Sequence, residues 1–449
     1  MPVYKKLIGT SPSQVPRNKD LGSMAFQNYT DFWSKQSHVS FRNKIINGAM
    51  KVDQRLTGPD YNNYYITGGA QTTNDNYYSY ITDMWFLLNN STGSTVRGQQ
   101  WYDGPTGYRQ NSIREYWYDP DMGHCLRIFC AAGATSGATG EVGVGTWIEA
   151  FDTNEMTPEW NGNDWRNYYT LSFWVRSTIR GEYSVSIWNK GANRSYIRKY
   201  TIDSVNRWEW KEIQFFWDSS RGSRLDESNI RVMWDLGSGS NFQKTDPTII
   251  LNPNDGSASP NTNLYWQDGR FSRITNTTNW IGTTGSYFYL TGVQLERGDR
   301  ATPFERRPIA LETQLCRRYL YVERYDGGMN GPLIGHAIST TDIRGVMKLP
   351  TRMRRQDYRV WTMTYTSGLA TVTTTPTPGS SQGQFTYMTS GFGNPGTFGS
   401  FEINYKTYDR FNWRQYNTSV SYTAGDASLM YVNSGPAFLI VSSEMDTLT

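Results

Sequence analysis

The chain has 449 residues, a formal net charge of +4 at pH 7 and 19% charged residues, which is enough length for two or three domains with cores of their own. Lysines and arginines are interleaved with acids rather than gathered in runs, which disfavours nucleic-acid binding. No stretch approaches the roughly 18 consecutive apolar residues of a membrane span, and residues 1–24 lack the apolar segment of a signal peptide. We therefore expect synthesis in a cytoplasm, no export by that route and no membrane insertion.

The composition also indicates the fold class. Aromatic residues make up 15% of the chain, with 31 Tyr and 17 Trp, and there are 42 Gly, which is typical of an all-β protein with long polar loops. Two interpretations of the aromatic content stay open: packing in cores and between subunits, or a surface that stacks on sugars. The three cysteines are too few for a disulfide framework and fit a reduced compartment.

Residues 1–36 contain prolines, glycines and scattered apolar residues, with no regular pattern. Such a segment cannot build its own core, so it is either a disordered tail or an arm that orders against a partner. The spaced apolar residues favour an attachment arm. Its candidate anchors are Val15, Leu21, Met24 and Phe26.

A β-rich body is predicted for residues 37–308. "TLSFWVRS", "EYSVSIW" and "RWEWKEIQFFW" alternate with a period of two between Gly-, Asn- and Ser-containing turns, which predicts antiparallel strands in a jelly-roll-like sandwich. Residues 237–280 are polar and predict a long loop where specificity could reside. In "YFYLTGVQLER" the apolar phase slips at Thr291–Gly292, which predicts a β-bulge.

The end of that strand marks a predicted domain boundary. A burst of charge and two prolines follow it, and Pro308 suits a helix start. Leu311, Leu315 and Tyr319 then recur at helical spacing, so we expect a short linker helix at 309–324. "DYRVWTMTY", "SFEINY" and "AFLIVSSEM" predict strands in a second, C-terminal β-sandwich knob at 325–449, with "TTTPTPGSSQGQ" as a loop inside it.

Motifs of catalysis are absent from the sequence. It holds no G-x-S-x-G, no H-E-x-x-H and no phosphate-binding glycine loop. Glu149 and Asp152 could serve as a carboxylate pair for glycoside cleavage, but their separation in space cannot be predicted, and they equally suit strand and turn positions. We therefore expect no enzyme activity.

Metal binding is also disfavoured. His124, Cys125 and Cys130 lack a fourth ligand at zinc spacing, so we interpret them as a strand with buried cysteines. The stretch "LNPNDGS" could hold calcium or form an ordinary turn. No cofactor is predicted.

Three stretches resemble tailed-bacteriophage fibre and virion structural proteins. "NKIINGAMKVDQR" (43–55) resembles their opening motif, and "GTSPSQVPRNKDLGSMAFQN" (9–28) resembles their N-terminal attachment peptide. "YFYLTGVQLERGDRATPFERRPIALETQLCRRYLYV" (287–322) resembles the stretch by which they leave a carbohydrate-binding-module-like sandwich. The five residues from Gly292 to Glu296 are the most specific part.

The resemblance implies a virion appendage, commonly a homotrimeric tail fibre. Its arm would dock on a tail or other virion protein, and its C-terminal domain would face the host and bind a surface glycan without cleaving it. Leu311, Leu315 and Tyr319 would face inward around a three-fold axis, or the helix would pack on its own domain. A head fibre or decoration protein without a receptor, and a capsular polysaccharide depolymerase, stay open as alternatives. The sequence identifies no receptor-contact residues.

Overall fold

The structure is a computed structural model. It describes residues 41–54, 64–67, 78–105, 122–149, 168–217, 230–245, 266–298, 300–325, 328–356, 358–364, 385–389, 400–416, 427–432 and 437–442. Several predictions fall outside these residues: the arm at 1–36 with Val15, Leu21, Met24 and Phe26, Asp152, and the loops at 251–257 and 373–384. None of the described helices is long and apolar enough to span a membrane.

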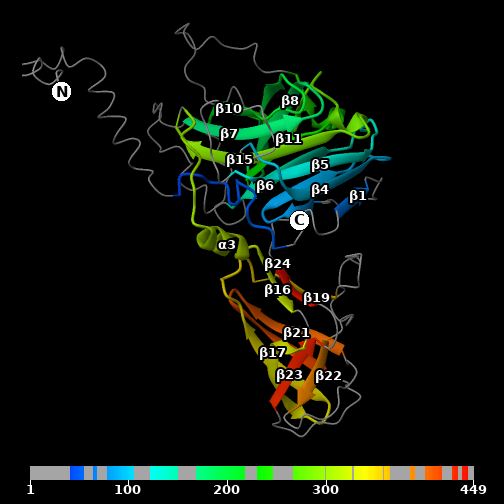
Figure 1. Ribbon diagram of the computed structural model, residues 1–449, viewed down its shortest axis with the longest axis vertical. Coiled ribbons are helices and arrows are strands. Elements are labelled where there is room, and N and C mark those ends of the chain that lie inside the picture. Colours follow the sequence, from blue (N-terminus) through cyan, green and yellow to red (C-terminus); the bar gives the residue numbers. More distant parts are fainter. Residues whose placement is uncertain are drawn as a thin grey trace, which may run out of the picture.

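Two antiparallel sheets form the sandwich in the first part of the chain (Figure 1). The six-stranded sheet has the order β1-β4-β5-β15-β7-β10, with bounds β1 Tyr64–Thr67, β4 Thr95–Tyr102, β5 His124–Ala132, β15 Tyr287–Arg297, β7 Tyr168–Ser177 and β10 Glu209–Phe216. The seven-stranded sheet has the order β13-β9-β8-β11-β6-β3-β2, with bounds β13 Trp266–Asp268, β9 Arg194–Ile202, β8 Gly181–Asn189, β11 Ile230–Asp235, β6 Val142–Ile148, β3 Trp85–Asn89 and β2 Tyr78–Thr82.

Alternation of side chains builds the core between these sheets. On β7 the inward residues Leu171, Phe173 and Val175 are buried, because successive side chains of a strand point to opposite faces. Much of the core is aromatic: the ring of Trp234 lies 5.9 Å from that of Trp85 and 5.2 Å from that of Phe173. Core packing therefore accounts for a large share of the aromatic residues.

The predicted β-bulge in β15 is confirmed. The register between β15 and β7 shifts between Thr291 and Gln294, and Gly292 has a φ of 60°. A left-handed residue inside a strand favours glycine, because a Cβ would be strained there.

Part of the predicted loop at 237–280 is folded. Its described part contains 3₁₀ turns η4 (Ser240–Phe242) and η6 (Trp280–Gly282), and β12 (Gln243–Lys244) pairs in parallel with β14 (Arg273–Ile274). Strand β13 extends the seven-stranded sheet. Isolated apolar residues within a polar stretch anchor these pieces; Trp266, Ile274 and Trp280 are buried.

The predicted helix is present but shorter than expected. Helix α3 spans Ile309–Arg317, and strand β16 (Leu320–Tyr325) follows, so the extension of the helix to 324 is wrong. Aromatic and β-branched residues favour a strand when a partner is available. Here β24 supplies the partner, with Val322 opposite Ile440.

The C-terminal region is β-rich, as predicted, and contains two antiparallel sheets. One has the order β16-β24-β19, where β24 is Ala437–Ser442 and β19 is Arg359–Thr364. The other has the order β20-β23-β17-β18-β22-β21, with bounds β20 Phe385–Thr389, β23 Ala427–Val432, β17 Gly328–Ser339, β18 Asp342–Lys348, β22 Arg410–Tyr416 and β21 Ser400–Thr407. Figure 1 shows α3 between the sandwich and these sheets.

Candidate functional site

The outer face of the six-stranded sheet carries a regular array of arginines and aromatic rings. On β5, Leu126 and Ile128 are buried inward, whereas Arg127 and Phe129 alternate with them and are half-buried. Strand register extends this pattern sideways, because directly paired residues share a face. We name this surface the arginine–aromatic face; it comprises Arg97, Gln99, Trp101, Arg127, Phe129, Arg176, Trp208, Tyr287 and Tyr289.

One row of the face crosses four strands. Gln99 of β4 is opposite Arg127 of β5, Arg127 is opposite Tyr289 of β15, and Tyr289 is opposite Arg176 of β7. Guanidinium groups and rings therefore alternate across the sheet. This order keeps like charges apart and lets each cation contact a ring, an attractive arrangement.

Arg127 is held in place by its neighbours. Its Cζ lies 3.4 Å from the ring centroid of Trp101 and 5.8 Å from that of Tyr287. Its Nη2 donates a hydrogen bond of 3.0 Å to Oε1 of Gln99. Stacking fixes the plane of the guanidinium group and leaves its edge for hydrogen bonding.

The neighbouring row is more aromatic. Phe129 and Tyr287 have ring centroids 4.7 Å apart, Tyr287 stacks on Tyr289 at 6.0 Å, and Cζ of Arg97 lies 5.6 Å from the Phe129 centroid. A cavity of about 80 Å³ opens beside these rings. Its lining consists of Arg97, Gln99, Arg127, Phe129 and Tyr287.

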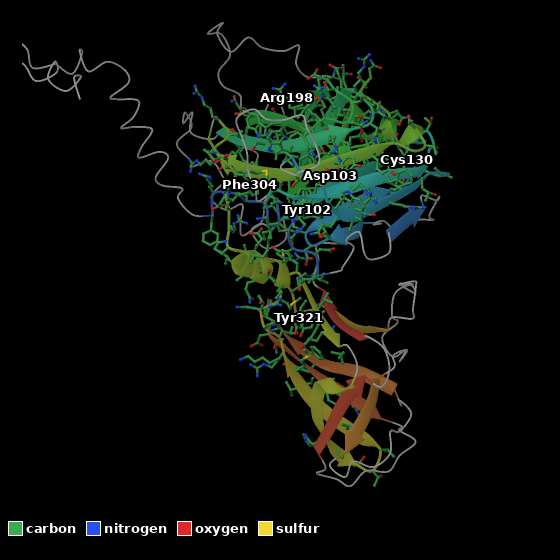
Figure 2. All side chains as sticks on the ribbon, in the orientation of Figure 1. Tyr102, Asp103, Cys130, Arg198, Phe304 and Tyr321 are labelled. Atoms are coloured by element: carbon green, nitrogen blue, oxygen red, sulfur yellow. The ribbon has the colours of Figure 1, made fainter. Side chains whose placement is uncertain are left out.

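The other half of the face is closed by internal contacts. Nη2 of Arg176 donates to Oδ2 of Asp103 at 2.7 Å, and Nε1 of Trp208 donates to the Asp103 carbonyl oxygen at 3.0 Å. Cζ of Arg176 also lies 3.9 Å from the Tyr289 ring centroid. Figure 2 shows Asp103 near Tyr102, with Cys130 farther to the right. Since this half is internally paired, the cavity at Arg127 is the better place for a ligand.

Burial shifts the pKa of several groups here. It lowers the pKa of Arg127, although nearby Tyr289 and Tyr287 act in the opposite direction, and it raises the pKa of Tyr289. Burial and the charge of Lys51 lower the pKa of His124, so this imidazole is neutral at pH 7. The charged form of Arg127 is therefore penalised by partial loss of water, and a bound anion would offset that penalty.

The three residues predicted for a trimer axis take different positions. Tyr319 is 1% exposed and belongs to the sandwich core, and Leu315 packs against that core. Leu311 is partly buried on the first turn of α3. The inward packing of Tyr319 and Leu315 agrees with the interpretation of a helix packed on its own domain. A role of these residues in a trimer stays a prediction.

Glu149 has a structural environment. Its oxygens accept hydrogen bonds from Nε and Nη2 of Arg318, at 3.0 and 2.7 Å, and from the hydroxyl of Tyr319 at 2.8 Å. The carboxylate thus ties the end of β6 to the turn after α3. These contacts fit the strand-end interpretation of this residue.

The strand interpretation of His124, Cys125 and Cys130 is confirmed, since all three lie on β5. Both thiols are buried, and burial raises the pKa of Cys125 to about 12. Within the described ranges no three His, Cys, Asp or Glu side chains gather in a way that could hold a metal ion.

Two of the stretches that carried the family resemblance interlock. We name residues 43–54 and 293–312 together the clasp. The amide of Val293 donates to the Gly48 carbonyl oxygen at 2.9 Å, and Nδ2 of Asn43 donates to the Val293 carbonyl oxygen at 3.1 Å. The amide of Asn47 donates to Oε1 of Glu312. The start of the sandwich and the segment that leaves it are therefore one structural unit.

Sequence patterns did not identify the arginine–aromatic face, although a signal for it exists. Arg97, Gln99 and Trp101 occupy one phase of β4, while Val96 on the other phase is buried. Half-buried rings and cations on the phase opposite a core residue mark an outer face. The sequence alone does not reveal the order of the strands in the sheet, so it could not show that β4, β5, β15 and β7 bring these residues together.

Comparisons with known proteins give limited matches. No protein-family model matches the chain, and neither does any curated protein. Among solved structures, the chain is similar to the enzymatically active domain of bacteriophage CBA120 tailspike protein 4, with 12% identity and a TM-score of 0.25 over 57% of this chain and 22% of that one. This chain thus spans about a fifth of that tailspike chain.

Two carbohydrate-binding modules are also similar. The family 11 module from Clostridium thermocellum, solved with a beta-1,3-1,4-mixed-linked tetrasaccharide, has 13% identity and a TM-score of 0.24, covering 51% of this chain and 96% of the module. A xylan-binding domain from Paenibacillus barcinonensis has 9% identity and a TM-score of 0.21, covering 53% and 99%. Values this low carry no argument about function.

Proposed function

We propose that this chain is a structural protein of a phage virion, a homotrimeric tail fibre that binds a host-surface glycan through its arginine–aromatic face without cleaving it. In this proposal the chain is made in the host cytoplasm, and residues 1–36 anchor it to the tail or another virion protein. The virion part is supported by the resemblance of residues 9–28, 43–55 and 287–322 to such proteins.

A single observation supports glycan binding: half-buried rings and fixed hydrogen-bond donors surround an open cavity on the outer face of a sheet. The C–H faces of sugar rings stack on aromatic side chains, and sugar hydroxyls accept hydrogen bonds from guanidinium and amide groups. Phe129 and Tyr287 offer the rings, Arg127 and Gln99 offer the polar groups, and Trp101 holds Arg127 in place by stacking on it. The site lies on the sandwich, so host contact is proposed there in addition to the C-terminal region.

Weak binding at each site suits such a role. Three copies in a trimer present three faces, and linked sites raise the overall affinity without any new contact. A shallow site is then sufficient for attachment.

The test is binding of the full-length protein to a panel of bacterial surface glycans, followed by titration of the best ligand. Trp101→Ala is expected to weaken binding at least tenfold, about 1.4 kcal/mol, because the ring holds Arg127, which lines the cavity. Trp210→Ala is the matched control, since Trp210 is 45% exposed on β10, which is separated from β4 by three strands. Equal losses in the two variants, or no binding to any glycan by the unaltered protein, would contradict the proposed site.

The virion part needs a different experiment. Cryo-electron microscopy of intact particles is expected to locate trimers of this chain on the tail. The same chain on the capsid would favour a head fibre or decoration protein. Release of reducing sugar from capsular polysaccharide by the purified protein would instead support a depolymerase.

A further inference from the structure

From the cavity beside Arg127 we infer that the glycan is acidic: the cavity receives an oxyanion, a carboxylate or a phosphate, that is part of a sugar residue. The inference rests on the proposed glycan-binding function and names the chemical class of its ligand. Three features of the structure support it.

The first feature is the charge of the lining. Two of the five lining residues, Arg97 and Arg127, bear guanidinium groups, and none is an acid. The carboxylate of Asp103, also near this face, is engaged by Arg176 at 2.7 Å. A cavity lined in this way attracts an anion more strongly than a neutral hydroxyl.

The second feature is the fixed state of Arg127. Within the part of the chain that the structure describes, this residue forms no ion pair with a carboxylate; its polar contact is with Gln99, at 3.0 Å. Stacking on Trp101 at 3.4 Å holds the group before any ligand arrives. A preorganised guanidinium edge offers two parallel N–H donors, which match the two oxygens of a carboxylate or a phosphate, and little further side-chain entropy is lost on binding.

The third feature is the combination of cavity size and wall. About 80 Å³ holds a few water molecules or one small polar group of a ligand. The rings of Phe129 and Tyr287, 4.7 Å apart, border the same cavity. A sugar bearing an acidic group fits both parts of the cavity. Its ring can stack on the aromatic wall while its oxyanion reaches the guanidinium edge of Arg127.

The experiment compares matched acidic and neutral polymers on the full-length protein. Polygalacturonate tests the carboxylate and phosphomannan tests the phosphate. Carboxyl-reduced polygalacturonate and dephosphorylated mannan are the neutral counterparts. At least one acidic polymer is expected to bind at least tenfold more tightly than its own neutral form, and the polymer that does so identifies the oxyanion.

Two variants test the role of the arginine. Arg127→Gln is expected to reduce the preference for the acidic polymer over its neutral form to less than threefold. Arg127→Lys keeps the charge but loses the planar fork, so an intermediate preference is expected. Arg198→Gln is the matched control: Arg198 also stacks on a ring, with its Cζ 5.5 Å from the Tyr196 centroid, but lies on β9 of the other sheet. An unchanged preference in Arg127→Gln would overturn the inference.

A measurement on the unaltered protein keeps the inference testable if Arg127→Gln does not fold. Raising the salt concentration from 50 to 500 mM screens charges, so binding of the acidic polymer is expected to weaken at least fivefold and that of the neutral form less than twofold. Equal binding of the acidic and neutral forms overturns the inference that the ligand is acidic but leaves the proposed glycan binding intact. Failure to bind these polymers and every glycan of the panel overturns both.

Discussion

Asn47 is the central residue of the clasp, and its replacement by alanine is the sharpest test of the fold. The side chain is 1% exposed. Its Nδ2 donates to the carbonyl oxygens of Val52 and Asp83, at 2.8 and 2.9 Å, and its Oδ1 accepts from the Val52 amide at 3.0 Å. Its backbone is left-handed, with a φ of 55°, which asparagine tolerates better than alanine.

The expected cost follows from these contacts. Three hydrogen bonds at about 1 kcal/mol each give about 3 kcal/mol, and the buried groups left unpaired raise the upper limit to about 5 kcal/mol. The Val52 carbonyl oxygen keeps the hydroxyl of Thr82 as a donor, at 2.9 Å, so the lower value is favoured. The left-handed backbone adds about 1 kcal/mol for alanine.

Asn206→Ala is the matched control. Asn206 also has a left-handed backbone, with a φ of 59°, but it is exposed, and its side chain makes no hydrogen bond to the described residues. Urea unfolding of the sandwich is expected to show Asn47→Ala less stable than Asn206→Ala by about 3 kcal/mol. Hydrogen exchange should also show lost protection of the Val52 amide. If the two variants lose equal stability, the clasp does not hold the sandwich as argued.

Two further predictions concern the bulge and a buried ion pair. Gly292→Ala is expected to lower the free energy of unfolding in urea by at least about 2 kcal/mol, since a Cβ would lie 2.8 Å from the sulfur of Met122 and 2.9 Å from an indole carbon of Trp174. Gly285 is also left-handed but has open space around it, so Gly285→Ala should cost about 1 kcal/mol. Equal costs in the two variants would refute the steric argument. Burial alone would raise the pKa of Glu141, but Arg231 and Arg270 lower it to about 2. The ionised Glu141 carboxylate therefore stabilises the folded protein fully above pH 4.5, and this contribution is lost as the pH falls toward 2. The loss of unfolding free energy in Glu141→Gln should therefore be about 2 kcal/mol smaller at pH 3 than at pH 7. A loss that does not change with pH would contradict this assignment. So would an equal pH trend in the exposed control Glu182→Gln.

Local patterns predicted the strands and the bulge because their causes are local. The alternation of "TLSFWVRS" and "YFYLTGVQLER" follows directly from the two-residue period of a strand with one buried face, and both stretches are strands, β7 and β15. Gly292 marked the slip of phase, and the register shifts at that place.

Features that depend on distant partners could not be predicted in the same way. Val322 falls within the helix predicted for 309–324, yet it lies in a strand because it pairs with Ile440, more than a hundred positions later. The clasp joins residues 250 positions apart, as between Asn43 and Val293. The arginine–aromatic face likewise depends on strand order, which places β15 between β5 and β7.

Contacts at and near the clasp also tie the start of the C-terminal sheets to the sandwich that carries the arginine–aromatic face. Beyond the clasp hydrogen bonds, Nε2 of Gln54 donates to the Leu320 carbonyl oxygen at 2.7 Å, and the Arg354 amide donates to the Arg318 carbonyl oxygen at 2.9 Å. The Glu149–Arg318 ion pair fixes the same turn. Strand β16 therefore starts from a point tied to the sandwich by several independent contacts. In a trimer, such a tied connection would hold the three faces in a set arrangement, and linked sites gain most when their geometry already fits the ligand.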